Sequence, residues 1–409
     1  MSLQPLQGIR VLDLSKVIAG PLCGQYLGEL GATVTKVEPP VTGDDTRAWF
    51  PQDQGISATY LAVNHNKHSL TLDLKHPQAR EVIHRLAQQS DVVLQGFGGG
   101  TATRLGVDYE TLRAVNPRLI YCEVSGYGRE GPKGNAPGYD VMLQAFSGML
   151  ATMGTPGGGL SRASFSPIDM STANYALSGI LAALLHRHQT GEGTYLEVCL
   201  LDTALGLMSY PIQNYWRSGR VPQPMGTAHP AMAPYQAFEA LDGPLMIGVG
   251  NEAQWRRFCA ASDLNELVDH PDFATNALRV ANFHQIVERV QQRVSQLTVQ
   301  DWLDRLEAAG VPCSPIHTVD QAVVHPQVQS RGLMVETQHP TLGPLRNVGL
   351  PVRFRGEPRQ AQCPPPLLGQ HTEDILRTAG YADADIQTLR ANGVLGPLPA
   401  KPDQAHTLS

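Results

Sequence analysis

The feature that most constrains this chain is an alternation of short apolar strands and helices through its first 125 residues. Residues 9–14 (IRVLDL) and 33–38 (TVTKVE) are predicted to form buried strands. The helix between them is predicted to begin near Pro21, because proline is tolerated in a first helical turn. The pattern is that of a βαβ unit, which has parallel strands and a right-handed connection.

The same alternation continues for three more strands. We predict strands at 69–74, 91–94 and 119–125, with helices at 77–89 and 109–115 between them. This order of elements predicts a doubly wound, Rossmann-like α/β domain, in which helices cover both faces of a parallel sheet.

Several well-known site patterns do not occur at the positions where they would indicate a function. The first βα turn, SKVIAGP at 15–21, lacks the GxGxxG pattern of dinucleotide-binding proteins, so NAD chemistry is not indicated. Neither GxSxG nor HExxH occurs, and the 14 histidines are scattered, so we expect no metal. A glycine-rich loop at 126–138 follows the last predicted strand, and a helix is expected from 140 to about 153.

Charge and cysteine usage indicate the compartment and the class of partner. The formal net charge is -6 and no basic stripe is present, so a nucleic-acid partner is not expected. The 6 cysteines lie far apart without a CxxC pair, which favours free thiols in a reducing compartment. The N-terminus does not have the pattern of a signal peptide. No run approaches the roughly 20 apolar residues of a membrane span. We therefore expect a cytoplasmic protein without a membrane partner.

A chain of 409 residues is too long for one simple core, and its composition and predicted elements change along the sequence. Residues 1–209 are expected to form the N-terminal part of a large domain, and 210–234, rich in Pro, Gly and aromatic residues, a linker. Residues 235–325 are expected to form a smaller α+β domain that opens with a hairpin turning at Asp242-Gly243. Residues 326–409 then return to the large domain.

Asp169 is the first candidate for chemistry. It follows Pro167 and precedes a helix of small residues, so its carboxylate faces the partial positive charge of a helix N-terminus, which favours the ionised form. The alternative is a helix N-cap, a common role for Asp in this position. From local spacing alone the cap is the commoner outcome.

Three other segments contain residues suited to binding. The segment GVGNEAQW at 248–255, with Gly248, Gly250 and Asn251, could bring backbone N–H groups close to a ligand, or could be a plain strand-to-helix turn. The block NHNKHSLTLDLKHP at 64–77 carries two lysines and several histidines, and Phe97 and Arg104 follow it. These residues suit a phosphate-rich, adenine-bearing ligand, or else a solvated strand edge. In PGYD, Tyr139 could orient a carbonyl or simply pack.

Taken in order, these blocks resemble the class III CoA-transferases, also called the CaiB/BaiF family, which includes formyl-CoA transferase and carnitine CoA-transferase and is related to α-methylacyl-CoA racemase. The resemblance runs almost from end to end, through LQGIRVLDLSKVIAGPLCGQYLGELGATVTKVEPP, NHNKHSLTLDLK, SGYGREGPKGNAPGYD, PIDM, HRHQTGEGTYLEVCLLDTAL, AHPAMAPYQAFEALDG, VGNEAQW and GQHTEDIL. It implies a Rossmann-like large domain made from both chain ends, a smaller inserted domain and an interlocked homodimer.

The resemblance also implies a mechanism and a set of cofactor contacts. Asp169 would be the nucleophile that carries coenzyme A as an aspartyl-CoA thioester between mixed anhydrides, and Gly248, Gly250 and Asn251 would close over the site. Two positions depart from formyl-CoA transferase, because Pro39 replaces an Arg and Gly96 an Asn, so Arg47 or Lys75 would have to supply the cation for the CoA phosphates. The residues matched to CoA-binding positions are Ile18, Ala19, Leu72, Lys75, Phe97, Arg104 and Tyr139.

The acceptor acid and one alternative reaction stay open. A short dicarboxylate is favoured as substrate, and the departures disfavour formate and oxalate. Its second carboxylate would need a cation, for which Arg47, Arg162, His229 and Lys133 are candidates. Racemisation at the α-carbon of an acyl-CoA is the alternative, and it needs two opposed acid/base groups. Tyr139 stands where related racemases have His, which argues against it.

Overall fold

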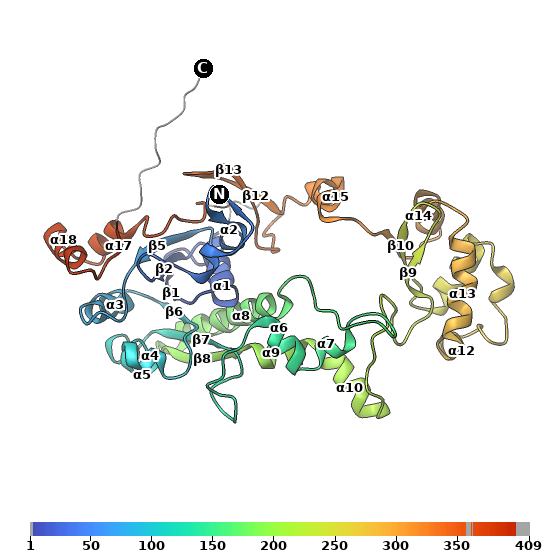
Figure 1. Ribbon diagram of the computed structural model, residues 1–409, viewed down its shortest axis with the longest axis horizontal. Helices are drawn as coiled ribbons and strands as arrows, with labels where there is room; N and C mark the ends of the chain where they lie inside the picture. The colour runs from blue at the N-terminus through green and yellow to red at the C-terminus, as the bar shows by residue number, and fades with distance from the viewer. Residues whose placement is uncertain (1–2, 357–360, 362, 398–409) are drawn as a thin grey trace, which may run out of the picture. The chain divides into compact units, whose positions relative to one another are not determined.

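The computed structural model describes residues 3–356, 361 and 363–397, and the chain divides into two compact units (Figure 1). The first unit combines residues up to 147 with 163–213 and with the described residues from 329 onward. The second unit contains 148–162 and 214–328. Both ends of the chain therefore contribute to the first unit, while its middle builds the second.

A six-stranded parallel sheet forms the centre of the first unit, in the order β5-β2-β1-β6-β7-β8. Its strands are β1 (Arg10–Leu14), β2 (Thr33–Glu38), β5 (Lys67–Thr71), β6 (Val92–Gln95), β7 (Ile120–Ser125) and β8 (Thr194–Cys199). The α/β class with a large parallel sheet, expected from the alternation of apolar segments, is confirmed.

One face of the sheet is covered by α1 (Ala19–Glu29) and α8 (Pro167–Thr190), which pack along each other. Helix α1 approaches the strands closely because small residues recur on its inner side. A Cβ at Gly24 would lie 3.0 Å from Asp13 Oδ2, and one at Gly28 only 2.7 Å from the carbonyl oxygen of Asn66. Glycine at these positions lets the helix lie directly on the buried polar end of the sheet.

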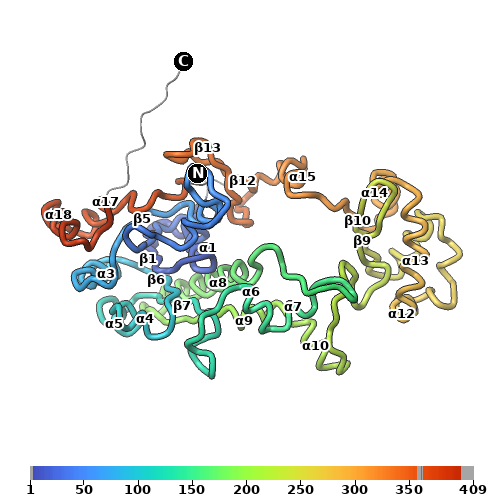
Figure 2. Tube along the Cα trace, in the orientation of Figure 1, coloured from blue at the N-terminus to red at the C-terminus, as the bar shows by residue number. Residues whose placement is uncertain are grey.

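The other face carries the main apolar core. Alternate residues of the strands, such as Leu12 and Leu70, pack there against Val82 and Ile83 of α3 and against Leu376 of α17. In Figure 2 the last described helices, α17 (Thr372–Thr378) and α18 (Asp383–Ala391), lie beside β5 and α3 (Ala79–Gln88). The chain thus returns to complete the core that its N-terminal part begins.

The remaining elements of the first unit are short. They are β3 (Gln52–Asp53), β4 (Ile56–Ser57), α2 (Ala58–Val63), α4 (Thr101–Leu105), α5 (Tyr109–Val115), α6 (Asp140–Phe146), α9 (Leu200–Leu207), β12 (Met334–His339) and β13 (Gly343–Val348), together with a 3-10 turn at Asp45–Ala48.

The second unit is an antiparallel three-stranded sheet with helices packed on it. The expected hairpin is present, with β9 (Tyr235–Glu239) paired to β10 (Pro244–Gly248) and β11 (Cys313–Pro315) on the other side of β10. Trp255, Phe258 and Trp302 are buried in its core. Its helices are α7 (Met149–Thr152), α11 (Glu252–Ala261), α12 (Asn276–Ala281), α13 (Phe283–Val294), α14 (Val299–Ala308) and α15 (Val319–Val324). Two more short helices, α10 (Ser209–Ser218) and α16 (Pro326–Ser330), fall at its ends.

These units differ from the expected boundaries in two places. The helix expected from 140 to about 153 ends at Phe146, because Gly148 has a φ of 84° that breaks the helical path. The residues after this break belong to the second unit, where Gly226 N donates to the Gly154 carbonyl at 2.8 Å. The expected linker at 210–234 also begins as helix α10.

Helix α8 is long and apolar enough to cross a bilayer by length and composition, the one such helix among the described residues. The core helix of a soluble protein satisfies the same criteria, and α8 packs on α1, β7 and β8 in this unit.

Candidate active site

A cavity of about 200 Å³ opens at the carboxyl ends of the central strands, where ligands of doubly wound sheets are usually bound. It is lined by Asp169 and by four segments at the ends of strands or the beginnings of helices, at 15–20, 96–98, 124–126 and 136–139. Arg129 and Leu200 complete its walls. The predicted residues Ile18, Ala19, Phe97, Tyr139 and Asp169 are all brought together here.

Asp169 lies inside the first turn of α8, and it is not the residue that caps the helix. The helix begins at Pro167, and Ser166 before it makes no capping hydrogen bond. Asp140 of α6 takes that role, since its Oδ2 accepts from Ile168 N at 2.7 Å and from Asp169 N at 3.0 Å. The alternative considered for Asp169, a helix N-cap, is therefore not what the structure shows, and its own carboxylate is left available to the cavity.

The protonation of Asp169 also differs from the expectation. Only 7% of the residue is exposed. Burial, and after it the charge of Asp140, raises the pKa of Asp169 from 3.8 to about 7. The favourable helix N-terminus was expected to keep this carboxylate ionised, but loss of solvent and a like charge outweigh it. Near neutral pH both forms are populated, and the ionised form is an unusually basic carboxylate.

The first βα loop is held under the cavity by buried charges. Val17 has a φ of 72°, a strained conformation for a β-branched residue. Its N–H donates to Asp44 Oδ1 at 3.3 Å, while Lys36 donates to the carbonyl of Ser15 at 3.0 Å and pairs with Asp44 at 2.8 Å. Asp13 Oδ1 accepts from the Ser15 N–H at 3.0 Å. These contacts maintain the loop in the shape that lines the cavity.

Two further cavities neighbour the first one, each sharing lining residues with the cavity before it. A cavity of about 330 Å³ shares Ser15, Lys16 and Phe97 with the Asp169 cavity and is also lined by Leu72 and Lys75. A cavity of about 620 Å³ then shares Lys75 with the second. It is lined by Leu74, Lys75, His76, Pro77, Arg80, Thr101, Arg104 and Leu105. Together the three cavities are lined by Asp169, by a group of cations and by every residue matched to a CoA-binding position.

The block at 64–77 does not act as one cluster, because side chains alternate between the two faces of a strand. Lys67 is fully buried and pairs with Asp13 at 2.9 Å. His65 is buried against Glu29. Of its lysines and histidines, Lys75 and His76, both beyond the end of β5, reach the cavities just described.

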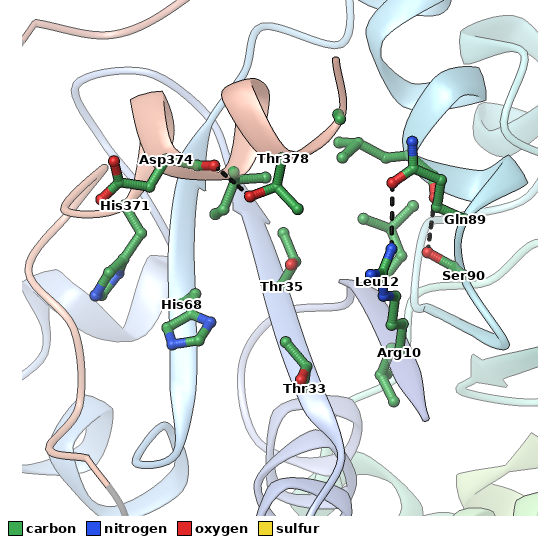
Figure 3. Close-up of a pocket in the computed structure, with 14 residues that line it drawn as sticks. Arg10, Leu12, Thr33, Thr35, His68, Gln89, Ser90, His371, Asp374 and Thr378 are labelled. Carbon is green, nitrogen blue, oxygen red and sulfur yellow. Dashed lines mark hydrogen bonds between the residues drawn. The ribbon is translucent and has the colours of Figure 1, made fainter. Parts of the chain in front are cut away.

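His68 points to the opposite face of the sheet, into a separate cavity of about 370 Å³ between α3 and α17 (Figure 3). Its ring lies 4.7 Å from that of His371, centroid to centroid. Burial, followed by the proximity of His68, lowers the pKa of His371 to about 4. None of the predicted site residues lines this cavity.

Arg47 is not placed with the other predicted CoA-binding residues. Its guanidinium binds both oxygens of Glu38, at 2.7 and 2.8 Å, and lies over the Tyr60 ring at 3.8 Å. It lines none of the three neighbouring cavities. Lys75, the other cation expected there, lines two of them. Lys16, Arg129 and Arg80 also line these cavities, with Lys16 paired to Asp45 at 2.9 Å and Arg129 paired to Glu123, and the sequence interpretation missed these three because no local pattern marks them.

The glycines of the VGN loop belong to the second unit and form a capped turn. Asn251 Oδ1 accepts from Gln254 N at 2.9 Å and caps α11. Gly250 N donates to the Gln254 side chain at 2.7 Å. This geometry is the plain strand-to-helix turn that was considered as the alternative. A role for Gly248, Gly250 and Asn251 in closing the site stays a prediction.

The glycine-rich loop at 126–138 closes on itself. A Cβ at Gly126 would lie 2.8 Å from Gly138 Cα, so glycine allows the two ends of the loop to touch. Its first letters, GYGREG, match a dinucleotide pattern, but no helix opens there and α6 begins only at Asp140. The loop therefore brings Tyr139 and Asp140 next to the end of β7 and does not form a pyrophosphate turn.

Across residues 3–356, 361 and 363–397, no group of three or more His, Cys, Asp or Glu side chains could hold a metal.

Comparison with known proteins bears on this site. The profile of CoA-transferase family III matches residues 6–372. The chain is 37% identical over 396 residues to human succinyl-CoA:glutarate CoA-transferase, covering 96% of this chain and 90% of that protein. It is 33% identical over 353 residues to acetyl-CoA:oxalate CoA-transferase of Acetobacter aceti, covering 86% and 90%.

Two solved structures have the same fold. A CaiB/BaiF family protein from Brucella suis is 35% identical with a TM-score of 0.81, covering 92% of this chain and 100% of that one. Rv3272 from Mycobacterium tuberculosis is 31% identical with a TM-score of 0.82, covering 91% and 99%.

Proposed function

Because the chain belongs to CoA-transferase family III and is a CoA-transferase, we propose that it moves coenzyme A from an acyl-CoA thioester to a short dicarboxylic acid, with Asp169 as the covalent carrier. The single observation that carries the role of Asp169 is its position, in a cavity that shares wall residues with a second cavity, which in turn shares Lys75 with the cavity lined by Arg104. An acyl-CoA has its thioester at one end and its phosphates at the other, so its site needs a nucleophile and cations that lie apart.

In the proposed reaction the acyl groups pass between covalent intermediates and are not hydrolysed. An Asp169 oxygen attacks the thioester carbonyl, the new C–O bond forms, and the C–S bond breaks with its electron pair on the CoA thiolate. The thiolate then attacks the acyl carbon of Asp169, which gives an aspartyl-CoA thioester and releases the donor acid. The acceptor carboxylate repeats both steps in reverse. Each intermediate stays activated, whereas hydrolysis would lose the thioester energy.

Two observations support a dicarboxylate as acceptor. Human succinyl-CoA:glutarate CoA-transferase and the Acetobacter aceti acetyl-CoA:oxalate enzyme are named for acids with two carboxyl groups. The Asp169 cavity also includes two cations, Lys16 and Arg129. Arg129 Nη2 donates to the Phe97 carbonyl at 2.5 Å, and its Nη1 makes no hydrogen bond with the described residues. Arg129 is therefore our candidate for the distal carboxylate, in place of Arg47, Arg162, His229 and Lys133.

We also propose a cytoplasmic homodimer. The outer sides of α8 and α9 expose apolar residues that a second copy would cover, among them Tyr175, Leu181, Leu185 and Leu205. All six cysteines are free, which suits a reducing compartment.

The experiment is an acceptor screen with the purified protein. Succinyl-CoA or acetyl-CoA is mixed with a panel of mono- and dicarboxylic acids, and the CoA products are identified by mass spectrometry. Dicarboxylates should accept CoA, and hydroxylamine should trap an adduct on Asp169. Turnover by Asp169→Ala would overturn the mechanism. Exchange of the α-proton of a 2-methylacyl-CoA in deuterated water without an acceptor would instead favour a racemase.

Arg129→Met tests the acceptor class. We expect a higher KM for dicarboxylates, because the distal carboxylate loses its partner, and little change in the KM of a monocarboxylate of equal length. An equal rise for both acids would show that Arg129 only supports the loop through Glu123 and Phe97.

A further inference from the structure

The first turn of α8 is capped from a distant part of the chain. An N-cap side chain normally accepts from the second or third amide of its own helix. In α8 those amides belong to Ile168 and Asp169, and both donate to Asp140 Oδ2, 28 and 29 residues earlier in the chain. The nucleophile is therefore held through its own N–H by a second carboxylate.

The other oxygen of Asp140 is held as well. Its Oδ1 accepts from Gln144 Nε2, one turn along α6, and Gln144 Oε1 accepts from Ala163 N at 3.2 Å. Asp140 is 6% exposed and Gln144 fully buried. Three N–H groups thus point at this carboxylate, whose two oxygens can accept from all of them. The side chains link α6 to the segment leading into Asp169, so the nucleophile and its support form one rigid group.

We infer that Asp140 is a positioning residue of the transferase, which orients the Asp169 turn and places a negative charge beside the nucleophile that is relieved each time Asp169 is acylated. The inference rests on the proposed function of Asp169. In the free enzyme two buried carboxylates lie close together, because Asp140 Oδ2 accepts from the Asp169 N–H at 3.0 Å. When an Asp169 oxygen bonds to an acyl carbon, its charge leaves on the CoA thiolate and the repulsion disappears. Destabilising the starting carboxylate in this way favours the covalent states.

The electrostatic part of this inference depends on what else faces Asp169. Burial and the charge of Asp140 are the two causes that raise its pKa to about 7. The other titratable residues that line the cavity are Lys16, Arg129 and Tyr139. The titratable residues on the elements packed against α8 are Cys23, Tyr26 and Glu29 of α1, Tyr121, Cys122 and Glu123 of β7, Tyr195, Glu197 and Cys199 of β8, and Asp202 of α9. Asp140 is the only charged residue among the causes of the raised pKa.

The test separates the charge of Asp140 from its hydrogen bonds. Asp140→Asn keeps a carbonyl oxygen that can accept both amides but removes the charge, and Asp140→Ser keeps a shorter capping hydroxyl if the first variant folds poorly. Asp108→Asn is the matched control, because Asp108 caps α5 through Thr111 N at 3.2 Å and lines none of the cavities described above. The readout is the pH dependence of kcat/KM for the acyl-CoA donor, which reports the free enzyme.

We expect kcat/KM of the unmodified enzyme to rise with pH through an inflection near 7, as Asp169 ionises. Removing a neighbouring charge should move this inflection to lower pH by about one unit or more in Asp140→Asn and Asp140→Ser. Turnover at pH 8 should fall by about tenfold, because the carboxylate becomes a weaker nucleophile. Asp108→Asn should leave both quantities unchanged.

An inflection that stays in place in both Asp140 variants would overturn the inference, even if their activity fell, since a purely structural cap lowers rate and stability without moving it. Measuring the variant Asp169→Ala distinguishes this outcome from failure of the proposed function. If Asp169→Ala still turned over, the covalent mechanism itself would be wrong. If it were inactive while the inflection did not move, only the role of Asp140 would be lost.

Discussion

Replacing Asp169 by Asn should stabilise the protein while abolishing its activity. The carboxyl is 7% exposed and its pKa is raised from 3.8 to about 7, by burial first and then by Asp140. The folded protein thus holds this proton more tightly than the unfolded chain does. Stability linked to Asp169 is fully present below pH 3.8 and is lost as the pH rises to about 7.

The magnitude follows from the same values. A tenfold change in an acid dissociation constant corresponds to about 1.4 kcal/mol, so ionised Asp169 costs the folded state roughly 4 kcal/mol above pH 7. At pH 5 the cost is roughly 2 kcal/mol, because the folded carboxyl keeps most of its proton. Asn has nearly the same shape and no charge, so Asp169→Asn should recover these amounts at each pH.

Urea unfolding followed by circular dichroism at pH 5, 7 and 8.5 measures this difference, with Asp108→Asn as the matched control. Carboxyl groups away from Asp169 titrate alike in both proteins, so their contributions cancel in the comparison. A gain in the free energy of unfolding that grows with pH would support the reasoning. A difference that is the same at all three pH values, or a loss that grows with pH, would refute it.

Three further changes test other parts of the structure. Lys67→Met leaves the fully buried Asp13 without its partner at 2.9 Å and should cost about 3–5 kcal/mol of unfolding free energy, of which adding Asp13→Leu should restore a large part in urea titrations. Gly126→Ala places a Cβ 2.8 Å from Gly138 Cα, so it should distort the loop beside Asp169. The KM for acyl-CoA should rise, with only a small fall in the melting temperature. Trp302→Ala empties the core of the second unit and should cost about 3–5 kcal/mol by calorimetry, with Asp169 still trapped by hydroxylamine.

A helix entrance can favour or oppose an ionised carboxylate, depending on what surrounds it. The dipole of α8 favours the charge of Asp169, as the sequence suggested. Loss of water and a second carboxylate oppose it, and both depend on the packing of α6 against α8. Under the proposed mechanism this opposition is useful, because a more basic carboxylate is a better nucleophile.

The sequence by itself determined the elements and the class of fold. Hydrophobic period and helix-ending glycines are local properties, so five strands of the parallel sheet and the hairpin at 235–248 could be predicted within a few residues. The ordered blocks also indicated the family. Where the prediction of elements failed, as after Phe146, one glycine in a left-handed conformation decided the break.

Only the tertiary structure decided which polar groups meet. Asp140 and Asp169 lie 29 residues apart, Lys67 and Asp13 54 residues apart, and no spacing rule links such pairs. The same is true of Arg47, whose charge is taken up by Glu38 within the buried network beside β2. Burial and the identity of the neighbouring charge set both the pKa of a group and its freedom to bind a ligand, and these are properties of the folded chain.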